Sequence, residues 1–258
     1  ISAGRLPAAQ TGSVTVKLNT SIVMLPKEPM QPRFADDRVG FFQNSLTEFS
    51  DDQQTTDRGA IIQRYRLEPK DPERYRRGQL SEPKNPIIYY IDPATPKKWI
   101  PYLKAGVEDW NTAFEAAGFK NAIIAKEWPN DPNMSLDDAR YSVIRYLPSE
   151  TENAYGPRIV DPRSGEIMES HICWYHNVMN LLKKWYMVQC GPLDKRARTM
   201  TFDDKLMGSL IQFVSSHEVI HTFATMMLTL GVDIYTTSKL LGHSNVSTTQ
   251  IYLSLIHI

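Results

Sequence analysis

The string His217-Glu218-Val219-Ile220-His221 has the residue types and the spacing of a metal-assisted hydrolysis site. Residues four apart lie on one face of a helix, so two imidazoles placed in this way can bind one cation. Zn²⁺ suits such a pair, and the neighbouring carboxylate can take a proton from a metal-bound water. The string therefore predicts His217 and His221 as zinc ligands and Glu218 as the catalytic general base.

A third zinc ligand is missing from its usual place. Catalytic zinc takes three protein ligands and a water, in the extended pattern H-E-x-x-H-x-x-G-x-x-H. Here Ala224 holds the glycine position and Met227 holds the last histidine position. A thioether is a poor ligand for catalytic zinc, so Asp233 and His243 are the remaining residues of a usual ligand type before the extreme C-terminus.

The bulk composition sets wide limits. A chain of 258 residues fits one large domain or two smaller ones. The 29 basic residues balance 29 acidic residues, so the overall charge does not favour nucleic acid or an anionic membrane. Two cysteines, Cys173 and Cys190, imply no disulfide framework. The chain opens at Ile1 and not at Met, so we expect a fragment of a longer protein. The sequence shows no signal peptide and no apolar run long enough to span a membrane.

The elements that must position the string follow a regular order. Short apolar runs predict strands at 14–18, 21–25, 87–91, 122–126, 141–146 and 167–174. Helical spacing predicts helices at 96–117 and 177–188, and a further helix that opens at Asp203 and Asp204 and carries the string. This order predicts a twisted α/β sheet with the metal helix packed beneath it, and the mixed polarity of 167–174 indicates an edge strand.

Residues 20–221 resemble a family of bacterial metzincin-like zinc metalloproteases. The segments that carry the resemblance are Leu25–Arg33, Asp37–Phe42, Asn85–Pro93, Gly106–Phe119, Tyr155–Pro157, Asp161–Ile167 and Trp174–Asn177. The resemblance implies an α/β (α+β) fold with a metzincin-like twisted mixed sheet, a long helix and the H-E-x-x-H helix, followed by a short helical tail. It also implies Zn²⁺ as cofactor, peptide-bond hydrolysis, a peptide substrate added along strand 167–174, and a periplasmic or extracellular location.

Residues 222–252 instead resemble the C-terminal end of tyrosine recombinases of the phage-integrase type. The motifs are His221–Thr225, Leu240–His243 and Thr248–Tyr252. In that family the equivalent of His243 assists proton transfer and the equivalent of Tyr252 attacks a DNA phosphate. The family pattern has Arg where this chain has Ile220, and Lys239 is the only basic residue from 206 to 258. DNA is therefore predicted to be an unlikely partner, since phosphate binding needs several cations.

These resemblances predict three segments: a β-rich N-terminal segment at 1–84, a metzincin-like catalytic upper subdomain at 85–221, and a recombinase-like helical tail at 222–258. Residues 253–258 resemble a translated sequencing adaptor, so we expect a chimeric chain.

The leading hypothesis is a zinc metallopeptidase that acts on a peptide or protein substrate and is incomplete without its third ligand. The alternative is DNA strand exchange by a tyrosine recombinase through Tyr252, assisted by His243. A third hypothesis is a non-catalytic module that keeps only the sheet. His171 and His176 are predicted to be structural histidines, because a metal ligand needs partners at defined spacing.

Overall fold

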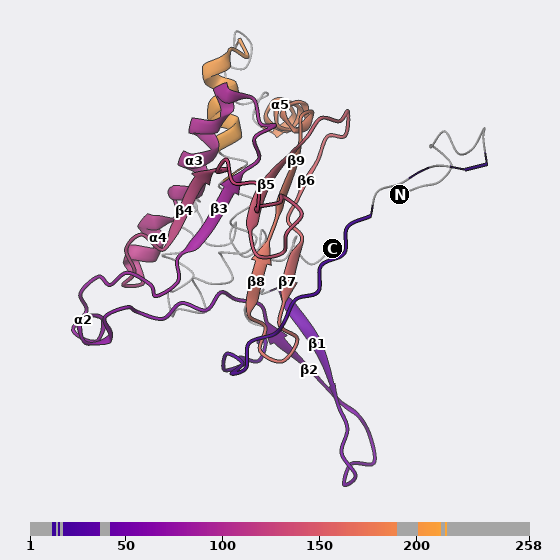
Figure 1. Cartoon of the computed structure of the whole chain (residues 1–258), viewed down its shortest axis with the longest axis vertical. Helices are drawn as coiled ribbons and strands as arrows, with labels where there is room; N and C mark the ends of the chain where they lie inside the picture. Colours follow the sequence, from indigo (N-terminus) through magenta and orange to yellow (C-terminus); the bar gives the residue numbers. More distant parts are fainter. Residues whose placement is uncertain are drawn as a thin grey trace.

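A computed structural model describes residues 12–13, 15, 18–36, 42–189, 201–212 and 215 (Figure 1). Its centre is a five-stranded sheet made of β3 (Ile87–Ile91), β4 (Ile123–Glu127), β5 (Ser142–Leu147), β6 (Ala154–Tyr155) and β9 (Ile172–Tyr175). The strand order is β4-β3-β5-β9-β6. The first four strands are parallel, and β6 pairs antiparallel with β9. The predicted mixed α/β sheet is confirmed.

Strand β3 forms because its apolar run is buried between two neighbouring strands. Tyr89 and Ile91 are each 1% exposed, and β-branched residues pack well on such a pleated surface. The strand ends at Asp92, whose carboxylate accepts a hydrogen bond from the backbone N–H of Ala94 at 2.8 Å. The strands predicted at 87–91, 122–126 and 141–146 are confirmed to within one residue.

The helix predicted at 96–117 is divided into the 3-10 helix η2 (Lys97–Trp99), α3 (Ile100–Glu108) and α4 (Asn111–Ala116). The break comes before Asn111, whose side chain bonds the backbone of β4. Its amide donates to the carbonyl of Ile123 at 2.9 Å, and its oxygen accepts from the N–H of Ala122 at 3.0 Å. The helical layer ends at Gly118, where φ is +89°.

Two further helical stretches cover the same core. They are α5 (Val178–Gln189) and residues 204–212 with 215, which lie beside α3 in Figure 1. Val178, Met179 and Ile211 belong to the hydrophobic cluster that contains Tyr89 and Trp174. The predicted helix at 177–188 is confirmed, and so is the start of the helix at Asp203 and Asp204.

Two hairpins complete the described fold. One pairs β1 (Gln43–Glu48) with β2 (Asp57–Ile62), and the other pairs β7 (Arg158–Val160) with β8 (Ile167–Ser170). A short helix α2 (Pro72–Arg76) begins at Asp71, whose side chain accepts from the N–H of Arg74. Figure 1 shows the β1–β2 hairpin extending away from the central sheet.

The edge strand predicted at 167–174 is wrong in two respects. The run is interrupted at His171, so it forms two strands, β8 and β9. The strand that joins the central sheet is β9, and it lies between β5 and β6. The cause is the turn at Asp161–Gly165, which folds the chain back and brings Ala154 and Tyr155 against β9. The strand predicted at 21–25 is also absent, and the prediction at 14–18 falls largely outside the described residues.

Gly165 provides a stability test of this turn. Its φ is +74°, and a Cβ at this position would lie 2.0 Å from the carbonyl oxygen of Ile62. We expect Gly165→Ala to lower the free energy of unfolding by about 3 kcal/mol, because left-handed strain adds to a backbone clash. Gly78 has φ +72° with nothing within 4 Å, so Gly78→Ala isolates the strain and should cost about 1 kcal/mol.

Urea unfolding of both variants measures these costs. Equal losses at Gly165 and Gly78 would show that the close approach of Gly165 to Ile62 does not form.

Candidate functional site

The residues predicted to carry chemistry lie outside the described part of the chain. They are His217, Glu218 and His221 for the zinc site, and His243 and Tyr252 for the recombinase site. The described residue nearest to them in sequence is Ser215. The structure therefore shows how the chain approaches the predicted sites.

The helix that leads toward the string is fixed against the core at Ile211 and Ser215. These residues lie four apart and are 1% and 2% exposed. The hydroxyl of Ser215 donates to the carbonyl oxygen of Leu103 in α3 at 3.2 Å. Both residues line a small apolar cavity together with Leu103, Ile144, Ile172, Trp174 and Val178. The orientation of the helix at residue 215 is thus set by burial and by one buried hydrogen bond.

Polar contacts along this helix hold it to the same layer. Asp204 pairs with Lys98 at 2.9 Å, and the side chain of Gln212 donates to Asp109 at 2.9 Å. Gly208 lies against Tyr102, where a Cβ would come 2.2 Å from the ring. The glycine therefore allows the helix to approach α3 closely.

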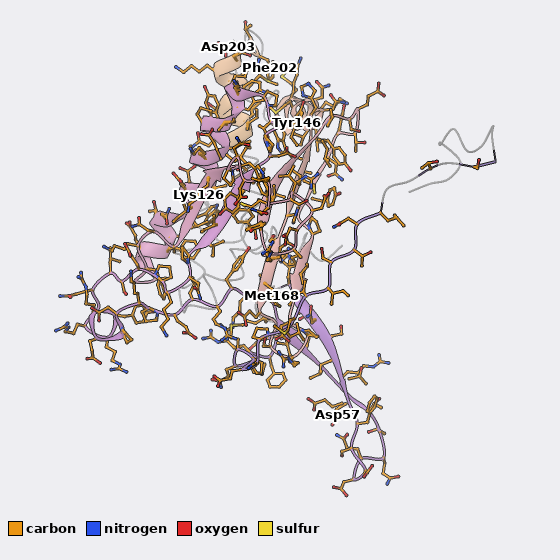
Figure 2. All side chains as sticks on the ribbon, in the orientation of Figure 1. Asp57, Lys126, Tyr146, Met168, Phe202 and Asp203 are labelled. Carbon is orange, nitrogen blue, oxygen red and sulfur yellow. The ribbon has the colours of Figure 1, made fainter. Side chains whose placement is uncertain are left out.

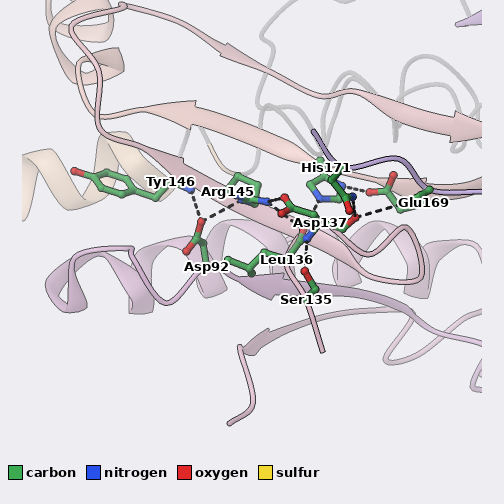
Figure 3. A network of polar contacts seen from close by, with 10 residues as sticks. Asp92, Ser135, Leu136, Asp137, Arg145, Tyr146, Glu169 and His171 are labelled. Atoms are coloured by element: carbon green, nitrogen blue, oxygen red, sulfur yellow. Dashed lines mark hydrogen bonds and ion pairs between the residues drawn. The ribbon is translucent and has the colours of Figure 1, made fainter. Parts of the chain in front are cut away.

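A buried polar network crosses the sheet at the end of β3 (Figure 3). Asp92 is 3% exposed and accepts from the backbone N–H of Tyr146 at 3.3 Å. Its carboxylate lies 3.3 Å from Nε of Arg145. Arg145 also donates to Asp137 at 2.9 Å and to the carbonyl of Leu136 at 3.1 Å. This guanidinium therefore joins β5 to the loop that precedes it.

His171 occupies the second half of the network. One ring nitrogen contacts the carboxylate of Glu169, which is 5% exposed, and the other lies 3.2 Å from the carbonyl of Leu136. Burial alone lowers the pKa of His171, but the contacts with Glu169 and Leu136 outweigh burial and raise it above its usual value. The carbonyl of the adjacent Asp137 accepts from Asn19 at 3.0 Å, so the N-terminal segment joins the network.

These contacts make His171 a structural residue, as predicted. His176 is also satisfied, because its ring nitrogen lies 2.7 Å from the hydroxyl of Tyr146. The sequence reasoning missed Asp92, Arg145 and Glu169. The available signals were an acidic residue directly after a buried strand, and a Glu two residues before a His.

Within the described ranges, no group of three or more His, Cys, Asp and Glu side chains is placed to hold a metal ion. A groove of about 540 Å³ beside β4 is lined by Lys84, Glu108 and Asn111, among others. Asn111 already bonds the backbone of β4, and Lys84 pairs with Glu68 at 2.9 Å. These two polar side chains of the groove therefore already have partners within the fold. The helices that the structure describes include none with the length and apolar content to cross a membrane.

Two sequence families match separate parts of the chain. Residues 176–256 match the phage integrase family, and residues 2–70 match a domain of unknown function, DUF5117. Residues 71–175 lie between the two matches. No solved structure matches the chain.

Curated relatives share the C-terminal similarity. Tyrosine recombinase XerC of Caldanaerobacter subterraneus is 67% identical over 39 residues, which cover 15% of this chain and 11% of that protein. Tyrosine recombinase XerA of Pyrococcus horikoshii is 59% identical over 39 residues, covering 15% and 14%. XerC of Halalkalibacterium halodurans is 41% identical over 63 residues, covering 24% and 21%. The chain therefore spans only 11% to 21% of the length of these relatives.

The C-terminal part of the chain is thus similar to tyrosine recombinases, and the leading prediction of a zinc metallopeptidase is wrong. The string His217–His221 misled the prediction because its residue types and spacing fit a zinc site. Four-residue spacing places two imidazoles on one helix face whether or not a metal is bound between them. The resemblance to the tyrosine recombinase end is confirmed.

The prediction of a peptide partner with DNA unlikely is also wrong. The range 206–258 holds one basic residue, Lys239, but most basic residues of the matched range lie before it. Residues 176–256 hold seven Lys or Arg and five Asp or Glu, and six of those seven basic residues lie at 183–205. A neutral total over the whole chain concealed this local excess of positive charge.

The His171 network predicts a pH dependence of stability. A histidine whose pKa is raised on folding stabilises the protein fully below its unfolded pKa of about 6.5, and loses that contribution as pH rises through the folded pKa. His171→Gln keeps a donor for Leu136 but carries no charge. We expect it to cost about 1–2 kcal/mol at pH 5.5 and clearly less at pH 8.5, as measured by urea unfolding.

His176→Gln is the matched control, because His176 has a neutral hydroxyl partner in Tyr146. A loss at His171 that is the same at both pH values would contradict the charged pairing with Glu169.

Proposed function

We propose that the C-terminal part of this chain is the DNA strand-exchange end of a tyrosine recombinase. The observation that carries the proposal is the match of residues 176–256 to the phage integrase family, which includes Leu240–His243 and Thr248–Tyr252. In this proposal Tyr252 is the nucleophile and His243 assists proton transfer. Because the chain spans a small share of its relatives, the activity of a whole recombinase is itself part of the proposal.

The chemistry is a transesterification at phosphorus. The Tyr252 oxygen forms a bond to the DNA phosphorus, the bond from phosphorus to one neighbouring nucleotide oxygen breaks, and the Tyr252 proton is given up. The released DNA hydroxyl takes a proton with the help of His243. One phosphodiester is exchanged for another, so the strand can be rejoined by the reverse reaction without an external energy source.

The departure at Ile220 predicts that this reaction is slow. The transition state at phosphorus carries more negative charge on its oxygens than the starting ester, and a guanidinium stabilises that charge with bidentate hydrogen bonds. Ile220 provides no such donor at the position where the family pattern has Arg. The proposed site therefore keeps its nucleophile, Tyr252, but stabilises the negative charge of the transition state less well.

A covalent adduct tests the proposal directly. We expect the full chain to form a denaturant-resistant complex with a labelled, nicked DNA duplex, because a nick lets the released strand diffuse away and traps the phosphotyrosine. Tyr252→Phe should abolish the complex, and Tyr235→Phe is the matched control that should keep it. If the complex forms equally without the Tyr252 hydroxyl, the assigned nucleophile is wrong.

The missing guanidinium gives a gain-of-function test. We expect Ile220→Arg to speed adduct formation by about 10²–10³-fold, the range for one preorganised charge-stabilising donor. Ile220→Gln controls for replacing the apolar side chain with a polar one and should have a much smaller effect. No increase with Arg would mean that residue 220 does not face the reacting phosphate.

The finer fold assignment is a separate proposal. We propose a metzincin-like fold for the part of 85–221 that precedes the recombinase match at residue 176, and the parallel strands β4, β3, β5 and β9 with antiparallel β6 at the edge support it. Zinc binding at His217 and His221, with Glu218 beside them, stays a prediction, and Met227 makes a complete ligand shell harder to build. The segment boundaries at 84 and 221 and the periplasmic or extracellular location also stay predictions.

A further inference from the structure

Three elements bring exposed lysines to one end of the molecule. Lys97 and Lys98 come from η2, Lys183 and Lys184 from α5, and Lys205 from the start of the 204–212 helix, and all five are exposed. We call this set the lysine end. In Figure 1 the three elements meet at the top of the view, and Figure 2 labels Phe202 and Asp203 there.

Side-chain contacts place two of these lysines beside the start of the 204–212 helix. Lys98 Nζ lies 2.9 Å from the carboxylate of Asp204. Lys183 Nζ lies 4.8 Å from the ring centroid of Phe202. Residues 202–204 are therefore flanked by a lysine from η2 and a lysine from α5, although these are 85 positions apart in sequence.

The lysine end keeps a net positive charge, because its five lysines outnumber the nearby carboxylates of Glu152, Asp203 and Asp204. Lys97 and Lys205 form no ion pair within the part of the chain that the structure describes. Lys98 and Lys184 pair with Asp204 and Glu152, but exposed ion pairs of this kind contribute about 0–1 kcal/mol and exchange readily for a phosphate.

We propose that the lysine end binds the phosphodiester backbone of DNA, and that Lys97 and Lys98 extend this surface beyond the recombinase-matched range. The inference rests on the proposed function, because that function supplies DNA as the polyanion. Lysine is a compact point charge that suits backbone phosphates and does not read base sequence. The surface therefore predicts affinity that depends strongly on salt and little on sequence.

The test is the salt dependence of DNA binding by the full chain. For duplex DNA, the slope of log K against log salt changes by about 0.9 for each phosphate contact. The double variant Lys97→Gln with Lys98→Gln should therefore make the slope less steep by about 1.8. It should also weaken binding equally for duplexes of unrelated sequence.

The matched control is Lys70→Gln with Lys84→Gln. These lysines are also exposed and lie near carboxylates, Glu82 at 3.8 Å and Glu68 at 2.9 Å. The control removes the same charge from the region beside α2, away from the lysine end in Figure 1. We expect its salt slope to equal that of the unchanged chain.

Four outcomes would overturn the inference, and they are distinguishable. An unchanged slope in the Lys97/Lys98 variant refutes the lysine end but leaves the proposed function standing. Equal losses in both variants indicate a general charge effect. Binding to vesicles of anionic lipid without binding to DNA assigns the surface to a membrane. No binding of DNA by the unchanged chain removes the proposed function together with the inference.

Discussion

The burial of Ile211, Ser215 and Val178 against the central sheet is the constraint on which the rest of the structure depends. Burying one aliphatic side chain of this size contributes about 1.5–3 kcal/mol, and Ser215 adds a buried hydrogen bond to Leu103. These residues lie in the range that matches phage integrases, yet they share one core with β5 and β9. The C-terminal part therefore starts from a fixed point on the α/β sheet, and the residues of the proposed site follow that point in sequence.

Elements that form because of nearby residues could be predicted from the sequence. Elements that depend on contacts with distant residues could not. The apolar run at 87–91 forms β3, in which Ile87, Tyr89 and Ile91 are buried and the residues between them are partly buried, so the local apolar pattern located it. The break in the helix before Asn111 depends on bonds to the backbone of Ile123, which residue spacing cannot reveal. Strand β9 is an inner strand of the sheet because β6 pairs with it, and the turn at Asp161–Gly165 brings the two strands together.

The site predictions failed for a related reason. Two histidines four apart fit a zinc site, but this spacing places any two side chains on one helix face, so the string alone could not decide the function. The deciding residues lie downstream, where Met227 replaces a metal ligand and Tyr252 ends a recombinase motif. The charge-based prediction about DNA also failed, because a balanced total over 258 residues concealed the basic stretch at 183–205. The Asp92–Arg145 contact joins segments that only the folded chain brings together, whereas the Glu169–His171 contact is local in sequence.

The central claim is that the tail performs chemistry on DNA through one hydroxyl. Peptide mapping by mass spectrometry, after incubation with a DNA substrate and nuclease digestion, measures this most directly. The account predicts a nucleotide mass on the peptide that contains Tyr252 and on no other tyrosine peptide. An unmodified Tyr252 peptide, or the nucleotide on the peptide that holds Tyr235, would contradict it.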